Sequence, residues 1–216
     1  ALMGWSMPDE REIFGFDEMV EAFDVDRMST SAPVFDTEKL NWLNGQYIRD
    51  MSSSAFMDRI AEWAVNRERL AELVPLIQER TERFIDLLPQ VDYLLGERAG
   101  ISPASFAHKS LGDADCLRIL DHVVRTLDQV SVWQQDDIFA ELKSLAEAMD
   151  VKLRDFLFPL FIAISGREVS LPLFDSMVFL GSDLTRTRIR TAIDALGGLS
   201  KKEGRRLERA FRELDR

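Results

Sequence analysis

The sequence predicts an all-α protein, and three of its features carry that prediction. Apolar residues recur at three- and four-residue spacing through most of the 216 residues, as they do on one face of a helix. Aspartate or serine precedes several of these segments, where a side-chain oxygen can cap the first turn of a helix. No stretch alternates apolar and polar residues for more than a few positions, so strands are not expected.

The N-terminal part is expected to hold three short helices. Asp17 can cap a helix over FDEMVEAF (16–23). Asp36 can cap a second helix that extends to about Arg49, and three serines, Ser52–Ser54, precede a third.

The middle of the chain is expected to hold longer helices separated by one loop. Apolar residues at helical spacing, from Leu70 to Leu88, predict a single helix over residues 67–88. Glycine and proline between 96 and 103 indicate a loop, followed by a weaker helix to about Ala114 and another helix over 116–130.

The C-terminal part contains the most apolar segment. A helix of regular period is expected over 138–149. The helix predicted over 153–165 is apolar on most sides, so it is expected to lie at the centre of the core. Asp183 can cap the next helix, which Gly197-Gly198 would end. A charged helix is expected over 201–214.

Two breaks in this pattern suggest domain boundaries. One is the DMSSS segment that follows Arg49, and the other is the loop between Leu95 and Ser105. We therefore expect four parts, which cover residues 1–50, 51–102, 103–198 and 199–216.

The charge of the chain is acidic overall but unevenly distributed. The formal net charge of −11 argues against a strongly basic nucleic-acid binder, because phosphate contacts need Lys and Arg. However, residues 186–216 contain 10 basic and 5 acidic residues, whereas residues 1–50 contain 4 basic and 11 acidic ones. Nucleic acid therefore stays open as a partner wherever the basic residues converge.

The composition favours a soluble protein of the cytoplasm. The single cysteine, Cys116, allows no intramolecular disulfide and fits a reducing compartment. The longest apolar run, Leu157–Ile164, is far shorter than the ~20 residues of a membrane-spanning helix. No signal peptide pattern opens the sequence, and no membrane partner is expected.

Patterns that indicate catalysis or metal binding are scarce. Cys116 lies between His108 and His122, at spacings that place the three on different helix faces and form no four-ligand set. An inert buried cysteine is therefore favoured over a metal ligand or a nucleophile. The carboxylate pairs at 113/115 and 136/137 fall at expected helix starts, where the helix dipole favours them. We expect no catalytic residue and no metal site in this chain.

The segment FDTEKLNWLNGQYIR (35–49) resembles part of the bacterial glutamyl-tRNA synthetases, a class I family. Residues 2–36 are similar to the helical stretch that follows the catalytic loop in that family. VPLIQERTERF (74–84), PLFIAISGREVSLPLFDSMVFLG (159–181) and RTRIRTAIDAL (186–196) are similar to its anticodon-binding region. The resemblance implies that the four parts are a stem-contact region, a helical cage subdomain, an anticodon-binding subdomain and a charged tail.

The resemblance places three polar or aromatic residues of the second helix against the tRNA stem: Asn41, Asn44 and Tyr47. In this family the segment lies where the stem-contact region meets the inside of the tRNA. Amides can hydrogen-bond sugar and phosphate there, while an aromatic ring packs on an apolar face. Trp42 is expected to belong to the protein core instead.

The resemblance also implies an anticodon site. Arg80 matches the family position from which an arginine contacts the last anticodon base, and a guanidinium can form two hydrogen bonds to a base edge. The alternative is an ordinary surface arginine. Ser170, Leu173 and Phe174 match a loop that lies against the anticodon, where a hydroxyl and exposed apolar faces suit unstacked bases. Phe161 stands where the family usually has arginine, so it either stacks on a base or weakens the site.

The function implied is that of the tRNA-binding C-terminal portion of glutamate–tRNA ligase, which attaches glutamate to tRNA(Glu) with ATP. The catalytic domain, which binds ATP and Mg²⁺, would precede residue 1, so this chain alone is expected to catalyse nothing. The expected partners are that domain and tRNA(Glu), with tRNA(Gln) as a second candidate, and the chain is expected to be a monomer. The alternative is a stand-alone helical interaction module without tRNA binding.

The tail is expected to form a solvated helix, with a weak contact to the tRNA backbone as the less favoured alternative. Four arginines fall at three- and four-residue steps and so share one face of that helix: Arg205, Arg209, Arg212 and Arg216. Truncation after Gly198 is expected to leave the fold intact. A large loss of stability would instead place Leu207, Phe211 and Leu214 in the core.

Overall fold

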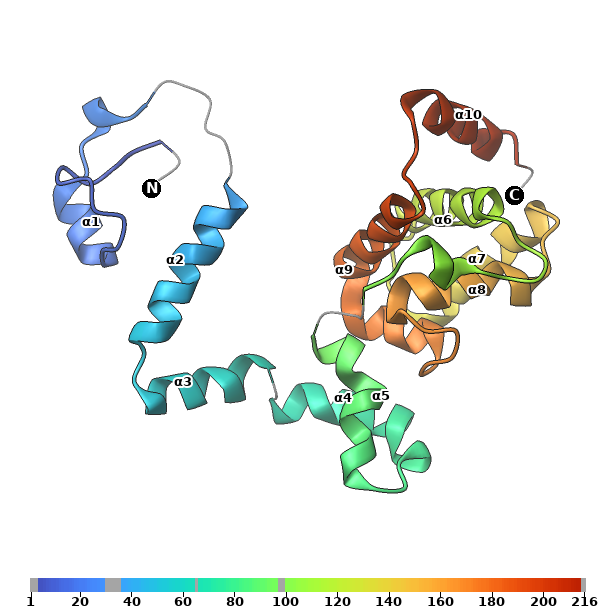
Figure 1. The fold of residues 1–216 in the computed structure, drawn as a ribbon, viewed down its shortest axis with the longest axis horizontal. Coiled ribbons are helices and arrows are strands. Elements are labelled where there is room, and N and C mark those ends of the chain that lie inside the picture. The colour runs from blue at the N-terminus through green and yellow to red at the C-terminus, as the bar shows by residue number, and fades with distance from the viewer. Residues whose placement is uncertain (1–3, 30–35, 65, 97–99, 215–216) are drawn as a thin grey trace. The chain divides into compact units, whose positions relative to one another are not determined.

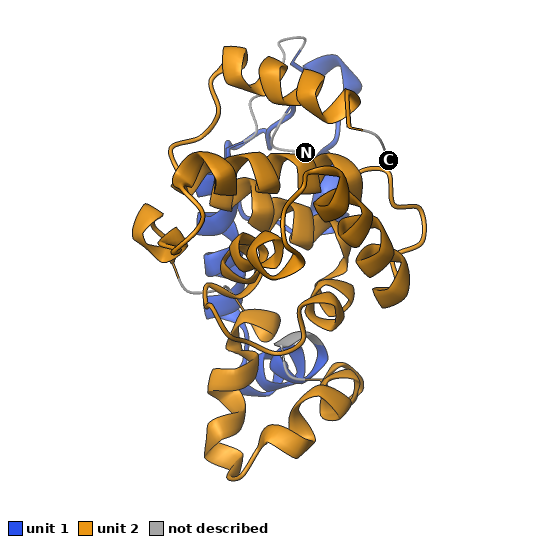
Figure 2. Cartoon of the chain, turned by 90° about the vertical axis from the view of Figure 1, so that its right-hand side faces the viewer, with its two compact units in different colours: residues 1–63 blue, residues 64–216 orange. Residues whose placement is uncertain are grey.

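The computed structural model describes residues 4–29, 36–64, 66–96 and 100–214, and Figure 1 shows that they form helices joined by loops. No strand occurs among these residues, and the all-α prediction is confirmed. The chain folds into two compact units, residues 1–63 and 64–216 (Figure 2). The division into four parts stays a prediction.

Each helix of unit 1 from α1 to α3 follows a residue that caps its N-terminus. They are α1 (Phe16–Ala22), η1 (Val25–Arg27), α2 (Thr37–Asp50) and α3 (Ser53–Arg59), with a π-helical turn, η2 (Ile60–Ala64), at the boundary. Asp36 Oδ1 accepts a hydrogen bond from the backbone N–H of Lys39 at 2.9 Å, so the predicted cap of α2 is confirmed. Ser52 caps α3 in the same way.

The predicted cap of α1 is wrong by two residues. Gly15 is the capping residue, and its N–H donates to the carboxylate of Glu18 at 2.6 Å. Asp17 lies inside the first turn instead, where its negative charge still interacts favourably with the helix dipole.

Unit 1 has a small core. Trp5 and Met7 are buried, and the ring of Trp5 packs against Phe14 and Phe23, with centroids 6.3 and 5.7 Å away. Helix α2 contains no buried residue. Trp42 on that helix is 49% exposed, so the expectation that it belongs to the core is wrong.

Unit 2 holds the remaining helices. The α-helices are α4 (Arg67–Ile77), α5 (Leu87–Leu95), α6 (Asp113–Leu127), α7 (Gln135–Ala148), α8 (Leu153–Ser165), α9 (Leu173–Ala195) and α10 (Lys201–Arg212). The 3₁₀ turns are η3 (Gln78–Arg80), η4 (Phe84–Asp86) and η5 (Pro103–Phe106).

The single helix expected over 67–88 is broken into α4, two 3₁₀ turns and α5. The break follows Ile77, where α4 ends, and the hydroxyl of Thr81 donates to the carbonyl of Ile77 at 2.9 Å. In a continuing helix the backbone N–H of Thr81 would donate to that carbonyl. It donates instead to Gln78 O at 3.4 Å. The weaker helix expected before Ala114 is also wrong, because only η5 forms there and α6 begins at Asp113.

Helix α8 belongs to the core of unit 2, as α6 and α9 do, and its place as the central helix stays a prediction. Seven of its 13 residues are buried, and it packs against α6, α7 and α9 in the bundle visible in Figure 1. Helix α9 is broken at Gly181. Its backbone φ of 79° is one that residues other than glycine rarely adopt. The predicted cap Asp183 follows this break and lies inside the element.

None of the helices in the described part of the chain combines the length and the apolar character needed to cross a membrane.

Candidate nucleic-acid interface

Arg80 is the last residue of η3, in a turn that its neighbours hold in place. The hydroxyl of Thr81 donates a hydrogen bond to Ile77 O at the end of α4. The side-chain nitrogen of Gln90, on α5, lies 3.4 Å from the hydroxyl of Thr81 and donates to Asp86 O at 3.1 Å. Gln90 therefore links both sides of the turn that carries Arg80.

The guanidinium of Arg80 is available for a ligand. Its side chain is exposed and has no hydrogen-bond or ion-pair partner among the described residues. Two nearby arginines are engaged. Arg83 makes two hydrogen bonds to Asp86, at 2.8 and 2.7 Å. Arg69 lies 4.8 Å from the ring centroid of Phe179, a cation–π distance.

A second candidate segment, the loop 166–172 between α8 and α9, begins at a glycine. Gly166 has φ 73° and ends α8 in the left-handed conformation, which glycine adopts without steric cost. The hydroxyl of Ser165 donates to Phe161 O at 2.8 Å and accepts from the N–H of Arg167 at 3.2 Å. The first turn of the loop is therefore fixed by local hydrogen bonds.

Arg167 joins this loop to α5. Its guanidinium donates to Pro89 O at 2.6 Å and to the carboxylate of Asp92 at 2.5 Å. Since α5 directly follows the turn that carries Arg80 and supplies Gln90 to it, one short helix contacts both candidate segments.

The structure distinguishes among the residues that the resemblance placed at the anticodon. Ser170 is half-buried, and its hydroxyl donates to Leu171 O at 3.0 Å. Phe174 is half-buried, with its ring edge-on to Phe139 at a centroid distance of 5.2 Å. Leu173 is only 3% exposed and belongs to the core. The expectation that Leu173 offers an exposed apolar face to a base is therefore wrong.

Phe161 differs from an arginine in more than charge. Its side chain is half-buried and packs against the core of unit 2 from within α8. It lies one turn before Ser165, which donates to its carbonyl oxygen. The packing accounts for a phenyl ring at this position without a ligand, and a role at the anticodon stays a prediction.

Sequence reasoning did not single out Arg188, a buried arginine of α9. Its guanidinium donates to Ile164 O at 2.7 Å, to Tyr93 O at 2.6 Å and to Gly96 O at 3.1 Å. It thus supplies donors to the carbonyl ends of α8 and α5, which helices leave unsatisfied. The available signal was its spacing, because it falls one turn after Thr185 and one turn before Ala192, both buried.

The predicted stem residues lie on α2 in unit 1. Asn41, Asn44 and Tyr47 are exposed, and three-residue steps make them neighbours on the helix surface. Tyr47 Oη donates to Phe14 O at 3.2 Å, which ties the helix to the segment before α1. Lys39 forms an ion pair with Glu12 in the same region. Their contact with RNA stays a prediction.

Cys116 is fully buried. Burial, together with the charges of Asp113 and Asp115, raises the pKa of its thiol to about 11, so the thiol is neutral at physiological pH and a poor nucleophile. Among the residues that the structure describes, no group of three His, Cys, Asp or Glu side chains could hold a metal ion.

Comparison with known proteins gives the family. Residues 55–193 match the family model described as the anticodon binding domain. Glutamate–tRNA ligases of Saccharophagus degradans, Marinobacter nauticus and Alcanivorax borkumensis are 46%, 45% and 43% identical to this chain. Each match covers 98% of this chain but only 42–43% of the relative, so the chain spans less than half the length of these curated relatives.

A solved structure supports the same fold. The crystal structure of a glutamate tRNA ligase from Elizabethkingia meningosepticum in complex with its amino acid superposes with a TM-score of 0.55 and 24% identity. The superposition covers 91% of this chain and 40% of that one, and at this identity it concerns the fold alone. The alternative of a stand-alone interaction module is not favoured by the matches. The resemblance to glutamyl-tRNA synthetases is confirmed, and the chain belongs to the anticodon-binding domain family.

Proposed function

We propose that this chain is the tRNA-binding portion of a glutamate–tRNA ligase. The observation that carries the proposal is the match of residues 55–193 to the anticodon-binding domain family. Within that range, the guanidinium of Arg80 is exposed and has no partner among the described residues. A guanidinium held on a fixed turn can form two hydrogen bonds to a base edge, and it keeps its charge at any physiological pH.

The loop 166–172 would form the second side of the anticodon site. Ser170 offers a half-buried hydroxyl and Phe174 the part of its ring that Phe139 leaves uncovered. Leu173 supports this site from the core rather than contacting RNA. In unit 1, Asn41, Asn44 and Tyr47 would contact the stem.

The whole ligase would supply what this chain does not. Its catalytic domain would bind ATP and Mg²⁺ and activate glutamate, in the cytoplasm, with this portion acting as a monomer. We propose tRNA(Glu) as the preferred ligand and tRNA(Gln) as the weaker one. Glutamate-dependent pyrophosphate exchange by the isolated chain should stay at background, and turnover by a pure sample would contradict this assignment.

A titration with labelled tRNA(Glu) at two salt concentrations tests the proposal. Binding should weaken as salt rises, because phosphate contacts release counterions. Arg80→Gln should cost about 1–3 kcal/mol, or roughly five- to 150-fold in affinity, if the arginine reads a base. Arg67→Gln is the matched control, since Arg67 is exposed and has no described partner. Absence of binding at low salt, or equal losses in both variants, would overturn the proposal.

Competition between tRNA(Glu) and tRNA(Gln) tests the preference. The wild-type chain should favour tRNA(Glu), and Arg80→Gln should narrow the difference, because specificity is a difference between two affinities. Equal affinities that the substitution leaves unchanged would remove Arg80 from the residues that read the anticodon.

A further inference from the structure

Helix α10 carries its basic residues on one side. At 100° per residue, six of them fall within an arc of about 140°: Lys201, Lys202, Arg205, Arg206, Arg209 and Arg212. All six are exposed. The apolar residues Leu207 and Phe211 lie on the opposite side of the same helix.

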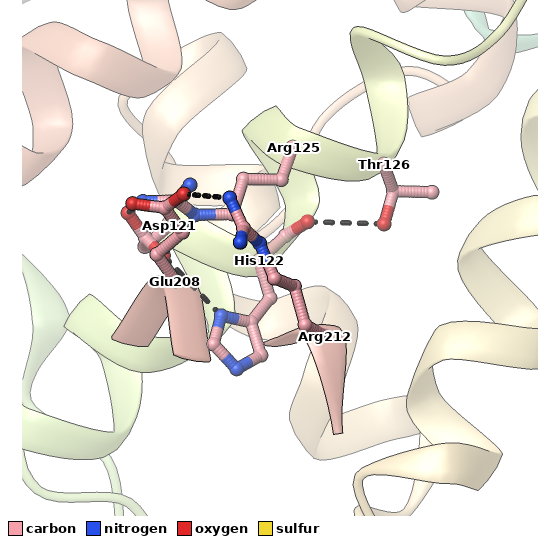
Figure 3. A network of polar contacts seen from close by, with 6 residues as sticks. All are labelled: Asp121, His122, Arg125, Thr126, Glu208 and Arg212. Atoms are coloured by element: carbon pink, nitrogen blue, oxygen red, sulfur yellow. Dashed lines mark hydrogen bonds and ion pairs between the residues drawn. The ribbon is translucent and has the colours of Figure 1, made fainter. Parts of the chain in front are cut away.

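The orientation of this basic side is fixed by contacts between α10 and α6. Leu207 is 6% exposed, and the ring of Phe211 is edge-on to His122, with centroids 5.4 Å apart. Figure 3 shows Glu208 and Arg212 of α10 beside the pair formed by Asp121 and Arg125. The hydrogen bonds from Arg125 to Asp121, with a smaller contribution from the carboxylate of Glu208, raise the pKa of Arg125.

Glu208 of α10 and its C-cap residue Glu213 neutralise only the C-terminal half of the basic side. Arg209 pairs with Glu213 at 2.9 Å, and Arg212 pairs with Glu208. Lys201, Lys202 and Arg205 have no ion-pair partner in the part of the chain that the structure describes. The first two turns therefore present at least three positive charges to solvent.

The stability of α10 does not account for its two lysines. Lys201 and Lys202 occupy the first turn of α10, where the helix dipole is positive and cations are unfavourable. The capping box formed by Ser200 and Glu203 stabilises the N-terminus of α10 in spite of these two lysines, but it gives no reason for their presence. In a chain of net charge −11, added lysines also bring the net charge closer to zero, which does not favour solubility.

We propose that the first two turns of α10, through Lys201, Lys202 and Arg205, bind the phosphate backbone of tRNA. This surface lies outside residues 55–193, the range matched by the anticodon-binding family. The inference rests on the proposed function, in that it takes tRNA as the ligand. Lysine presents a point charge that suits phosphate oxygens rather than base edges. The contact is therefore independent of base sequence, unlike the contact of Arg80.

The test compares two triple variants of the full chain with equal charge changes. One is Lys201→Gln/Lys202→Gln/Arg205→Gln. The control is Lys109→Gln/Lys152→Gln/Arg154→Gln, which removes three exposed cations without described partners from other elements of unit 2. The probes are a tRNA(Glu) transcript and the same transcript with a scrambled anticodon, and binding is measured over a range of salt concentrations. Circular dichroism melts verify that both variants are folded.

The slope of log K against log salt is negative, and the α10 variant should make it less steep by about 2–3 with both transcripts. Each lost phosphate contact removes about 0.7–0.9 from its magnitude. The control variant should keep the wild-type slope. If the wild-type chain distinguishes the transcripts but the α10 slope matches the control, this inference fails and the proposed function stands. If the wild-type chain binds both transcripts equally and the salt dependence of the α10 variant is still less steep, the anticodon assignment fails and this inference stands. Absence of binding to either transcript overturns both.

Discussion

Helices α2 and α8 have nearly the same length, 14 and 13 residues, but they are stabilised in different ways. Helix α8 buries seven residues in the core of unit 2, whereas α2 buries none. An isolated helix of this length is marginal in water. Helix α2 therefore depends on individual polar contacts: the Asp36 cap, the Lys39–Glu12 pair and the Tyr47–Phe14 hydrogen bond.

The difference shows where binding residues can lie in this protein. A helix held by core packing has little surface to offer, and Phe161 and Leu173 illustrate this for α8 and α9. A helix held by its cap and a few hydrogen bonds leaves Asn41 and Asn44 exposed. The stem-contact candidates therefore lie on the less buried helix.

The largest effect is expected in the core. Phe156 of α8 is fully buried, so Phe156→Ala should lower the free energy of unfolding of unit 2 by about 3–5 kcal/mol through lost burial and a cavity. Urea unfolding followed by circular dichroism gives the value. Phe84→Ala is the matched control, since Phe84 is 92% exposed, and it should stay within about 0.5 kcal/mol. Similar losses in both variants would contradict the conclusion that α8 is stabilised by core packing.

The next effect concerns α10, for which the structure alters the expectation drawn from the sequence. Leu207 is buried, and Phe211 and Leu214 pack against the core, so truncation after Gly198 should destabilise unit 2. Leu207→Ala alone should cost about 2–3 kcal/mol. Arg209→Ala, on the exposed side of the same helix, should cost no more than about 1 kcal/mol. A truncated chain with an unchanged melting temperature would show that α10 is only loosely attached.

The sequence was sufficient for those parts of the fold that local patterns determine. The apolar pattern of α8 predicted its bounds and its burial, the cap of α2 was predicted at Asp36, and a cap of α3 was predicted within Ser52–Ser54. The break after Ile77 was missed because apolar periodicity continues through it. At the break the hydroxyl of Thr81 donates to the carbonyl of Ile77, and the backbone N–H of Thr81 donates to that of Gln78.

The candidate site was less predictable, because its support comes from residues distant in sequence. Arg167 contacts α5 across 78 and 75 residues, and Arg188 contacts α5 and its C-cap Gly96 across 95 and 92. Spacing along the chain carries no information about such contacts. The exposure of Arg80 and the burial of Leu173 likewise follow from tertiary packing, and both residues were chosen by resemblance alone.

A third, smaller effect should depend on pH. Burial alone would raise the pKa of Asp121, but hydrogen bonds with His122 and Arg125 outweigh it and hold that pKa below its ordinary value of 3.8. The resulting stabilisation is complete above the ordinary value and is lost as pH falls through the lowered pKa. Asp121→Asn should cost about 1.5–3 kcal/mol at pH 7.

Thermal melts of the wild type and Asp121→Asn at pH 7, 5, 4 and 3 test this. The difference between the two proteins should be constant from pH 7 to 5 and should shrink as the pH falls below 4. A difference that grows on acidification would show that this carboxyl is not stabilised in its ionised form.

The smallest effect is expected in α2. Asp36→Ala removes a capping hydrogen bond and should cost about 1 kcal/mol, which corresponds to roughly fivefold faster hydrogen exchange of α2 amides if these exchange by local opening. Asp36→Asn is the control, because asparagine caps about as well as aspartate. Amides of α8 should be unchanged, since they depend on the core of unit 2. If α8 amides accelerate as much as those of α2, the two helices open together, and the contrast between a cap-dependent and a core-dependent helix does not hold.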